Sequence, residues 1–290
     1  MQTDLFGKRR YKVNLHTHTD LSDGKLSPAE AVAFYHRQGY DAIALTDHWF
    51  FGDGEETDAL TVLSGAEYNV GGADCRDGVY HILAIGARSA PAVSKSMSAQ
   101  QIITAIRSAG GLAVLAHPAW SLNTPQDIMQ LRGLDATEIY NSVSGVHMSR
   151  RPDSSLIIDM LATQDFLLPL IADDDAHYYD NDAGVSWIMV QAEDNTRESL
   201  LPAIRKGSFY ATQGPEIHLV QEGDEFAVYS SPVREIVFLS NVAWTRRVFE
   251  GEGLTEARYK PHPRDTFLRA QVTDAEGKQA WTNIISLKPN

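Results

Sequence analysis

The chain has 290 residues, of which 43% are hydrophobic and 22% charged, and its formal net charge at pH 7 is −13. These values are ordinary for a globular protein, and the acidic balance argues against a nucleic-acid-binding surface, which needs basic stripes. No apolar run reaches the roughly 20 residues of a membrane span, and residues 1–10 lack the apolar core of a secretory signal. The single cysteine, Cys75, is expected in a loop and excludes an internal disulfide, so we expect a cytoplasmic protein.

Strand-like and helix-like segments alternate up to about residue 212. The expected strands are 12–19, 42–48, 61–69, 80–86, 112–118, 136–141 and 168–173, and the expected helices are 28–38, 99–109, 124–131, 153–163 and 197–206. The first helix has a full start signal, with Ser27 as N-cap, Pro28 directly after it and Glu30 three residues on. This alternation predicts an α/β fold with mostly parallel strands.

Two architectures are open to such a chain, a doubly wound sheet and a barrel. No Gly-x-Gly-x-x-Gly motif follows the first expected strand, which disfavours a dinucleotide-binding fold. Histidines and acids instead gather where the expected strands end, which is the edge at which barrels build their sites. We therefore expect a closed or nearly closed TIM-like barrel.

The pattern changes from about residue 215, where short strand-like segments are separated by turn signals. The segments are 216–221, 225–230, 235–240, 245–249, 266–273 and 281–287. Such spacing is typical of antiparallel sheets. We predict a barrel over 1–212 and a small β domain over 213–290 that packs on it.

His16 and His18 end the first expected strand, and Asp23 and Gly24 follow directly. Residues i and i+2 of a strand point to the same side, so this pair could hold one ion. A single pair of this kind also occurs by chance. The later strand ends carry further candidate ligands, in the order His48, Glu67, His81, His117, Asp175 and His177. The whole series favours a metal site over a chance pair.

In order and approximate spacing, this series resembles the polymerase-and-histidinol-phosphatase (PHP) superfamily over residues 11–177. The resemblance implies a distorted (β/α)7 barrel that holds two or three ions. It also implies a division of the ligands: His16, His18 and Asp175 at one ion, Glu67 shared with His81 and His117 at a second, and Asp23, His48 and His177 at a third. Asp23 departs from the family, because many relatives have a histidine at that place. Mixed imidazole and carboxylate ligands suit zinc, manganese or iron rather than calcium.

The expected activity follows from this centre. Two ions about 3.5–4 Å apart can bridge a water, lower its pKa toward 7 and neutralise phosphoryl oxygens. We therefore expect a phosphoesterase that acts on a small phosphorylated metabolite by a metal-bridging hydroxide, with Glu67, Asp175 and His177 as catalytic residues. Two alternatives stay open: hydrolysis of a carboxyl ester, carbamate or amide at the same centre, and a non-catalytic, metal-stabilised binding module.

Some residues outside the ligand series are candidates for supporting the ligands or for contacting the substrate. Asp47, Asp173 and Asp174 are candidates for orienting imidazole N–H groups. Arg150, Arg151, His147 and Tyr178 are candidates for contact with an anionic substrate, since Arg binds phosphate bidentately; the alternative is that both arginines lie on the surface. Substrate specificity is expected in loops 49–58, 71–78 and 141–151, whose sequence does not name the substrate.

Overall fold

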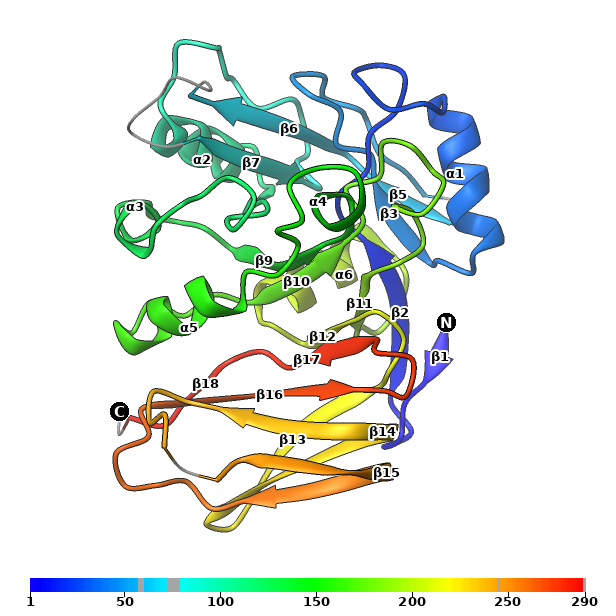
Figure 1. The fold of residues 1–290 in the computed structure, drawn as a ribbon. Coiled ribbons are helices and arrows are strands. Elements are labelled where there is room, and N and C mark those ends of the chain that lie inside the picture. The colour runs from blue at the N-terminus through cyan, green and yellow to red at the C-terminus, as the bar shows by residue number, and fades with distance from the viewer. Residues whose placement is uncertain (57–59, 72–78, 245, 289–290) are drawn as a thin grey trace.

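A computed structural model describes residues 1–56, 60–71, 79–244 and 246–288, so Cys75 lies outside the described residues. The helices and the smaller of two mixed sheets occupy one end of the molecule, and the larger sheet extends from there to the other end, where its strands β13 to β16 form a layer (Figure 1). Within the described ranges, no helix is long and apolar enough to cross a membrane. The predicted α/β class is confirmed.

The larger sheet combines the start of the chain with its entire C-terminal part. Its strands are β1 (Gln2–Thr3), β2 (Arg9–Asn14), β3 (Ala42–Ala44), β4 (Glu55–Glu56), β5 (Thr61–Leu63), β11 (Trp187–Val190), β12 (Phe209–Thr212), β13 (Ile217–Glu222), β14 (Glu225–Leu239), β15 (Val248–Tyr259), β16 (Phe267–Thr273), β17 (Gln279–Trp281) and β18 (Ile285–Ser286). Its main path runs β13-β14-β16-β17-β12-β11-β2-β3-β5-β4. Only β2, β3 and β5 pair in parallel; the other ladders of this sheet are antiparallel.

The smaller sheet has the order β10-β9-β8-β7-β6. Its strands are β6 (Gly65–Val70), β7 (Tyr80–Ile85), β8 (Leu112–Leu115), β9 (Ala136–Asn141) and β10 (Leu170–Asp173). β7 runs antiparallel to both β6 and β8, whereas β8, β9 and β10 are parallel. β7 is the exception to the expected parallel arrangement, because β6 and β7 form a hairpin rather than a β-α-β unit.

The two sheets do not merge into a continuous closed barrel in the part of the chain that the structure describes. They are joined instead by isolated parallel bridges, Thr17 with Ala176 and His48 with Glu67. Thr17, Ala176 and His48 lie just beyond strand ends and Glu67 lies within β6, so both bridges are among the candidate ligands. The sheets are thus tied together at the edge where the ligands gather.

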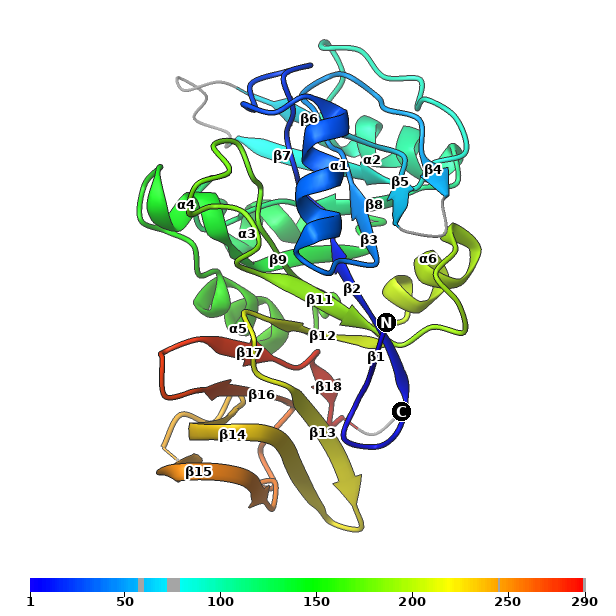
Figure 2. The ribbon, with the colours of Figure 1, turned by 90° about the vertical axis from the view of Figure 1, so that its right-hand side faces the viewer.

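The helices are α1 (Pro28–Arg37), α2 (Ala99–Ser108), α3 (Pro125–Met129), α4 (Ser142–Val146), α5 (Ser155–Thr163) and α6 (Arg197–Arg205), arranged around the two sheets (Figure 2). The predicted start of α1 is confirmed, since Ser27 and Glu30 form a reciprocal capping box with Pro28 in the first turn. Sequence reasoning missed α4, a single turn capped by Asn141.

Several expected strands are shorter than predicted; β3, for example, ends at Ala44 and β8 at Leu115. The run 61–69 is divided at Ser64 into β5 and β6, which belong to different sheets. β2 ends at Asn14, so the segment with His16 and His18 lies beyond it rather than within a strand. Side chains supplement the isolated backbone bridge of Thr17 there: Asn14 Nδ2 donates to His16 O at 3.0 Å, and Thr17 N donates to Thr46 Oγ1 at 3.0 Å.

The hydrogen-bonded ladder crosses the predicted domain boundary. β12 pairs with β17, with Ala211 opposite Trp281. Trp281 is fully buried among the side chains of β2, β8 and β12, and its ring stacks on Tyr140 at a centroid distance of 5.4 Å. The division at residue 212 stays a prediction, and the C-terminal strands supply part of the core beneath the candidate site.

Candidate metal centre

The predicted ligand residues come together from separate strand ends. His16 and His18 follow β2, His48 follows β3, His117 follows β8, Asp175 and His177 follow β10, Glu67 lies in β6, and Asp23 lies in the loop before α1. His81 is near the start of β7, and because β7 is antiparallel to its neighbours, its start lies at the same edge as their ends. The reversed strand therefore places its ligand correctly.

The most buried group consists of His16, His18, Glu67 and Asp175, whose ligand atoms lie within 4.8 Å of one another. The two Nε2 atoms are 3.1 Å apart, and Asp175 Oδ1 lies 3.1 Å from each. Glu67 Oε2 lies 3.2 Å from His16 Nε2 and 3.1 Å from His18 Nε2. Two ring nitrogens and two carboxylate oxygens thus face one point.

Hydrogen bonding alone does not satisfy this arrangement, and this is the test of whether a cation fits. Asp175 Oδ1 and His48 Nδ1 are buried without a hydrogen-bond partner among the described residues. Buried polar atoms are nearly always paired, and an unpaired carboxylate oxygen aimed at imidazole nitrogens matches a cation-binding set. The donor set fits zinc, manganese or iron; the nature and number of the ions remain predictions.

A second group gathers on the other oxygen of Glu67. His81 Nδ1 lies 2.5 Å and His117 Nε2 lies 3.4 Å from Glu67 Oε1. His117 Nε2 is also 3.8 Å from Asp175 Oδ2. Because the two oxygens of Glu67 face different histidines, this carboxylate can bridge two ion positions, as the resemblance implies.

The third group includes Asp23, whose side chain is 52% exposed. Asp23 Oδ1 lies 3.4 Å from His18 Nδ1 and 3.5 Å from His177 Nε2, and Asp23 Oδ2 lies 3.7 Å from His48 Nε2. His48 Nδ1 is 3.3 Å from Glu67 Oε2. His18 and His48 therefore each direct one nitrogen to Asp23 and the other to the buried carboxylates, so the division among three ions is less simple than predicted.

The protonation states of the histidines and acids in the site are set mainly by neighbouring groups of opposite charge. Burial by itself would lower the pKa of His18, but the negative charges of Asp175 and Glu67 outweigh it and raise the pKa to about 9. Burial would raise the pKa of Glu67 and of Asp175, yet the surrounding histidines hold both pKa values well below the ordinary range. The carboxylates therefore stay charged, and the imidazoles compete with any cation for them.

Glu138 is a site residue that sequence reasoning missed. It is fully buried in β9, and its Oε1 lies 2.7 Å from His16 Nδ1. Its Oε2 accepts hydrogen bonds from His117 N at 2.8 Å and Asn141 Nδ2 at 2.7 Å, and Asn141 Nδ2 also reaches Asp175 Oδ2 at 3.1 Å. An acid within a strand whose other residues carry no charge was the available signal. Glu138 fixes the ring of His16 with Nε2 toward the centre.

Of the three acids predicted to orient imidazoles, two have other partners. Asp47 accepts from Thr19 N and Ser22 Oγ, each at 2.7 Å, and so shapes the loop that carries Asp23. The other two lie beneath the loop after β10. Asp174 accepts from the backbone N–H groups of residues 184–186 and from Tyr35 Oη. Both oxygens of Asp173 are buried and have no hydrogen-bond partner among the described residues.

Local backbone conformation also marks the site. Two candidate ligands adopt positive φ angles, His117 at 28° and Asp175 at 52°. Residues other than glycine rarely do so, and such conformations cost about 1–3 kcal/mol each and concentrate at functional sites. Gly24 has a different constraint, since a Cβ there would lie 2.4 Å from His18 O. The loop with Asp23 therefore packs directly on the backbone of His18.

A cavity of about 220 Å³ opens at the centre. Besides candidate ligands, it is lined by Trp120, Val143, Ser144 and Met148. These residues were not predicted individually, although Val143, Ser144 and Met148 lie in the expected specificity loop 141–151. The other two expected loops include residues 57–58 and 72–78, which lie outside the described residues.

The predicted substrate residues lie at the rim or away from it. His147 Nε2 lies 2.7 Å from Asp180 Oδ1, and its ring lies 4.2 Å from that of Tyr178. Arg150 is exposed, and its Nη1 donates to Gly145 O at 3.0 Å. Neither Arg150 nor Arg151 is among the described residues that line the cavity. Substrate contact by these four residues stays a prediction, and the geometry favours it least for the arginines.

No protein-family model and no curated protein matches the chain. Its structure is similar to that of a two-domain protein from Bacteroides vulgatus that contains a predicted PHP-like metal-dependent phosphoesterase, with a TM-score of 0.57 and 15% identity over 98% of both chains. An amidohydrolase from Chromobacterium violaceum with bound sulfate and no metal matches 59% of this chain and 89% of its own, with a TM-score of 0.42 and 16% identity. A protein from Bifidobacterium adolescentis, described as a proposed metal-dependent phosphoesterase, matches 57% of this chain and 87% of its own, with a TM-score of 0.40 and 18% identity.

At such identities the comparison shows the fold alone. The first similarity extends over both the α/β part and the C-terminal strands. The chain therefore shares the overall fold of that two-domain protein.

Proposed function

We propose that the protein is a metal-dependent phosphoesterase that hydrolyses a small phosphorylated molecule. The observation that carries the proposal is the convergence of the buried histidines and acids with unpaired Asp175 Oδ1 at the floor of a cavity. The PHP-like fold supports it.

The residues of the chain have separable tasks in this reaction. Zinc, manganese or iron ions held by the three groups would supply an activated water near neutral pH and neutralise phosphoryl oxygens. Glu67 holds two groups at a fixed spacing through its two oxygens, and Glu138 fixes the ring of His16. Water adds to phosphorus and the ester P–O bond breaks, which yields inorganic phosphate and an alcohol. The cavity limits the size of the ester.

Hydrolysis of a carboxyl ester, carbamate or amide is the second candidate, and one observation favours it. No lysine or arginine lies among the described residues that line the cavity, so no fixed side-chain cation is available to recognise phosphate. Charge recognition would then rest on the ions, which act on a polarised carbonyl as well as on a phosphoryl group.

Metal-reconstituted protein separates these candidates. Protein stripped with a chelator is reloaded with zinc, manganese or iron, its ion content is measured by elemental analysis, and turnover is followed for phosphate monoesters, phosphate diesters, aryl esters and carbamates. Turnover of phosphate esters with competitive inhibition by inorganic phosphate supports the proposal. Turnover of carboxyl esters or carbamates alone supports the second candidate, and ion binding without any turnover supports a binding module.

A further inference from the structure

The lining of the cavity at the candidate metal centre combines two chemically different kinds of residue. Besides candidate ligands and Ser144, it includes Trp120, Val143 and Met148, which we call the apolar wall. Trp120 follows His117 by three residues and is half-buried, whereas Val143 is 2% and Met148 41% exposed. A bound molecule would therefore meet both polar atoms and carbon.

Trp120 is held beside two of the candidate ligands. Its ring centroid lies 4.9 Å from that of His117 and 5.5 Å from that of His81, with interplanar angles of 76° and 70°. Edge-to-face packing of this kind fixes aromatic rings relative to one another. The indole therefore has a defined position next to the point where the histidines converge.

The apolar wall offers little to a polar group. Ser144 is the neighbouring hydroxyl, and its Oγ already donates to Asn141 Oδ1 at 2.7 Å. Arg150, the nearest predicted cation, is bonded to Gly145 O outside the cavity. A sugar or a second phosphate placed against this wall would lose hydrogen bonds to water without replacement, which costs free energy.

The size of the cavity sets a further limit. At about 220 Å³ it is smaller than the roughly 300–1,000 Å³ of sites for drug-sized ligands. A nucleotide would not fit within it. A phosphoryl group with one ring or a short apolar chain matches both its volume and its mixed polar and apolar lining.

We propose that the substrate carries a small aromatic or apolar group beside the scissile bond, and that Trp120 is the main specificity-determining residue that binds this group. This inference rests on the proposed function, because it assumes that the metal centre binds phosphate. It selects aryl and small apolar phosphate monoesters over nucleotides and sugar phosphates.

Binding of non-hydrolysable analogues tests the wall without relying on turnover. Phenylphosphonate and methylphosphonate are titrated calorimetrically into metal-loaded protein, and the ratio of their Kd values measures the apolar preference. We expect wild-type protein to bind phenylphosphonate about 10- to 30-fold more tightly, from the burial and aromatic packing of one ring. Trp120→Ala should abolish this preference and leave methylphosphonate binding unchanged, whereas Trp120→Phe should retain most of it.

Trp244→Ala is the matched control, because Trp244 is 71% exposed in the C-terminal strands and stacks on Arg264. It should change neither Kd. The proposal is overturned if wild-type protein does not discriminate between the phosphonates, if Trp120→Ala keeps the preference, or if that variant weakens both ligands equally at unchanged metal content.

A second pair of ligands distinguishes an incorrect role for the apolar wall from an incorrect assignment of phosphoesterase activity. Benzoate and acetate differ by the same ring but lack phosphorus. If neither phosphonate binds but benzoate binds better than acetate and Trp120→Ala removes the difference, the wall is upheld and the phosphoesterase is rejected. If the protein binds the two members of each pair equally tightly, the role proposed for the apolar wall is rejected.

Discussion

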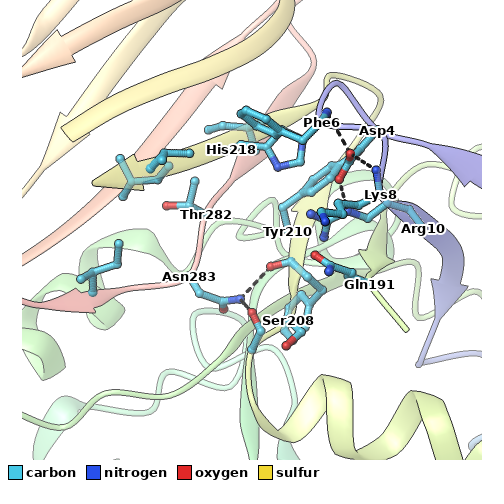
Figure 3. A pocket seen from close by; sticks show the side chains of 16 residues that line it. Asp4, Phe6, Lys8, Arg10, Gln191, Ser208, Tyr210, His218, Thr282 and Asn283 are labelled. Carbon is cyan, nitrogen blue, oxygen red and sulfur yellow. Dashed lines mark hydrogen bonds and ion pairs between the residues drawn. The ribbon is translucent and has the colours of Figure 1, made fainter. Parts of the chain in front are cut away.

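Two cavities of this molecule contain acids and histidines within metal-binding distance of one another, and they differ in how those groups are bonded. The cavity at the candidate metal centre measures about 220 Å³, whereas a second cavity, lined by the N-terminal segment, β12 and β13, measures about 490 Å³. Asp4 and His218 line the second (Figure 3), and a carboxylate oxygen of Glu216 lies within 4.8 Å of their ligand atoms. By size alone, the second cavity would be the better candidate.

Its polar groups, however, are already satisfied. Asp4 Oδ2 pairs with Arg10 Nε at 2.8 Å, and Asp4 Oδ1 accepts two backbone N–H groups, at 2.8 and 3.0 Å. Glu216 Oε1 accepts from His218 Nε2 at 2.6 Å and from Leu5 N at 2.7 Å. These contacts anchor the N-terminal segment to the C-terminal strands. A cluster of acids and histidines is therefore a metal candidate when its atoms face one another unsatisfied, as at Asp175 Oδ1.

The strongest test of this difference compares Glu67→Gln with Glu216→Gln. Glu67→Gln removes charge that two groups share, so we expect reduced metal content and a loss of about 10³-fold or more in kcat/KM. Glu216→Gln should leave both within a factor of about two, because its partners are structural. Elemental analysis and steady-state kinetics measure both variants; equal losses would erase the distinction between the cavities.

The next test concerns the stability of the second cavity. Asp4→Asn leaves the nearly buried guanidinium of Arg10 without its carboxylate, and breaking such a pair costs about 3 kcal/mol. We expect the free energy of unfolding, measured in urea, to fall by about that amount while the metal content stays unchanged. A loss of metal with unchanged stability would mean that this cluster is the metal site.

Glu138→Gln tests whether the buried carboxylate of Glu138 supports metal binding by positioning His16. The amide can still accept a hydrogen bond from His117 N but no longer offers two anionic oxygens to His16 and Asn141. Loss of such a supporting partner lowers metal affinity about 10- to 100-fold. Titration against a competing chelator measures the affinity. Unchanged affinity would show that the ring of His16 is fixed by packing alone.

The smallest effect is on pH dependence. Burial lowers the pKa of His218 below its ordinary 6.5, although Glu216 opposes the shift. The folded state then binds fewer protons than the unfolded state, so this residue's contribution to stability is complete above pH 6.5 and decreases as pH falls below it. His218→Gln should flatten that part of the unfolding curve measured between pH 5 and 7. A steeper dependence in the variant would contradict this assignment.

The site was more predictable from sequence than the sheet topology. His16, Glu67, His117 and Asp175 could be selected because metal ligands need particular side chains at strand ends, and both signals are local. Whether β7 runs parallel or antiparallel depends on pairing partners that no local pattern specifies. The same holds for the closed or nearly closed barrel, since the described strands form two sheets that only isolated bridges join.

The residues that support the candidate ligands or line the cavity could not be predicted from the sequence for a different reason. Glu138 has an unremarkable neighbourhood, and its role arises from β9 lying next to β8 and close to His16. Trp120 and Met148 enter the cavity through loop conformations that have no periodicity. Arg150 was named as a candidate because arginine suits phosphate, but chemical suitability does not fix the direction of an exposed side chain.

The ladder between β12 and β17 has a consequence for dissecting this protein. A fragment that ended at residue 212 would leave β12 as an open edge strand and would remove Trp281 from the core above which the ligands sit. Open edges with unpaired backbone groups promote association between chains, and loss of a buried tryptophan leaves a void. Such a fragment should aggregate rather than fold as a functional unit. The C-terminal strands should therefore be included in any fragment used to study the site.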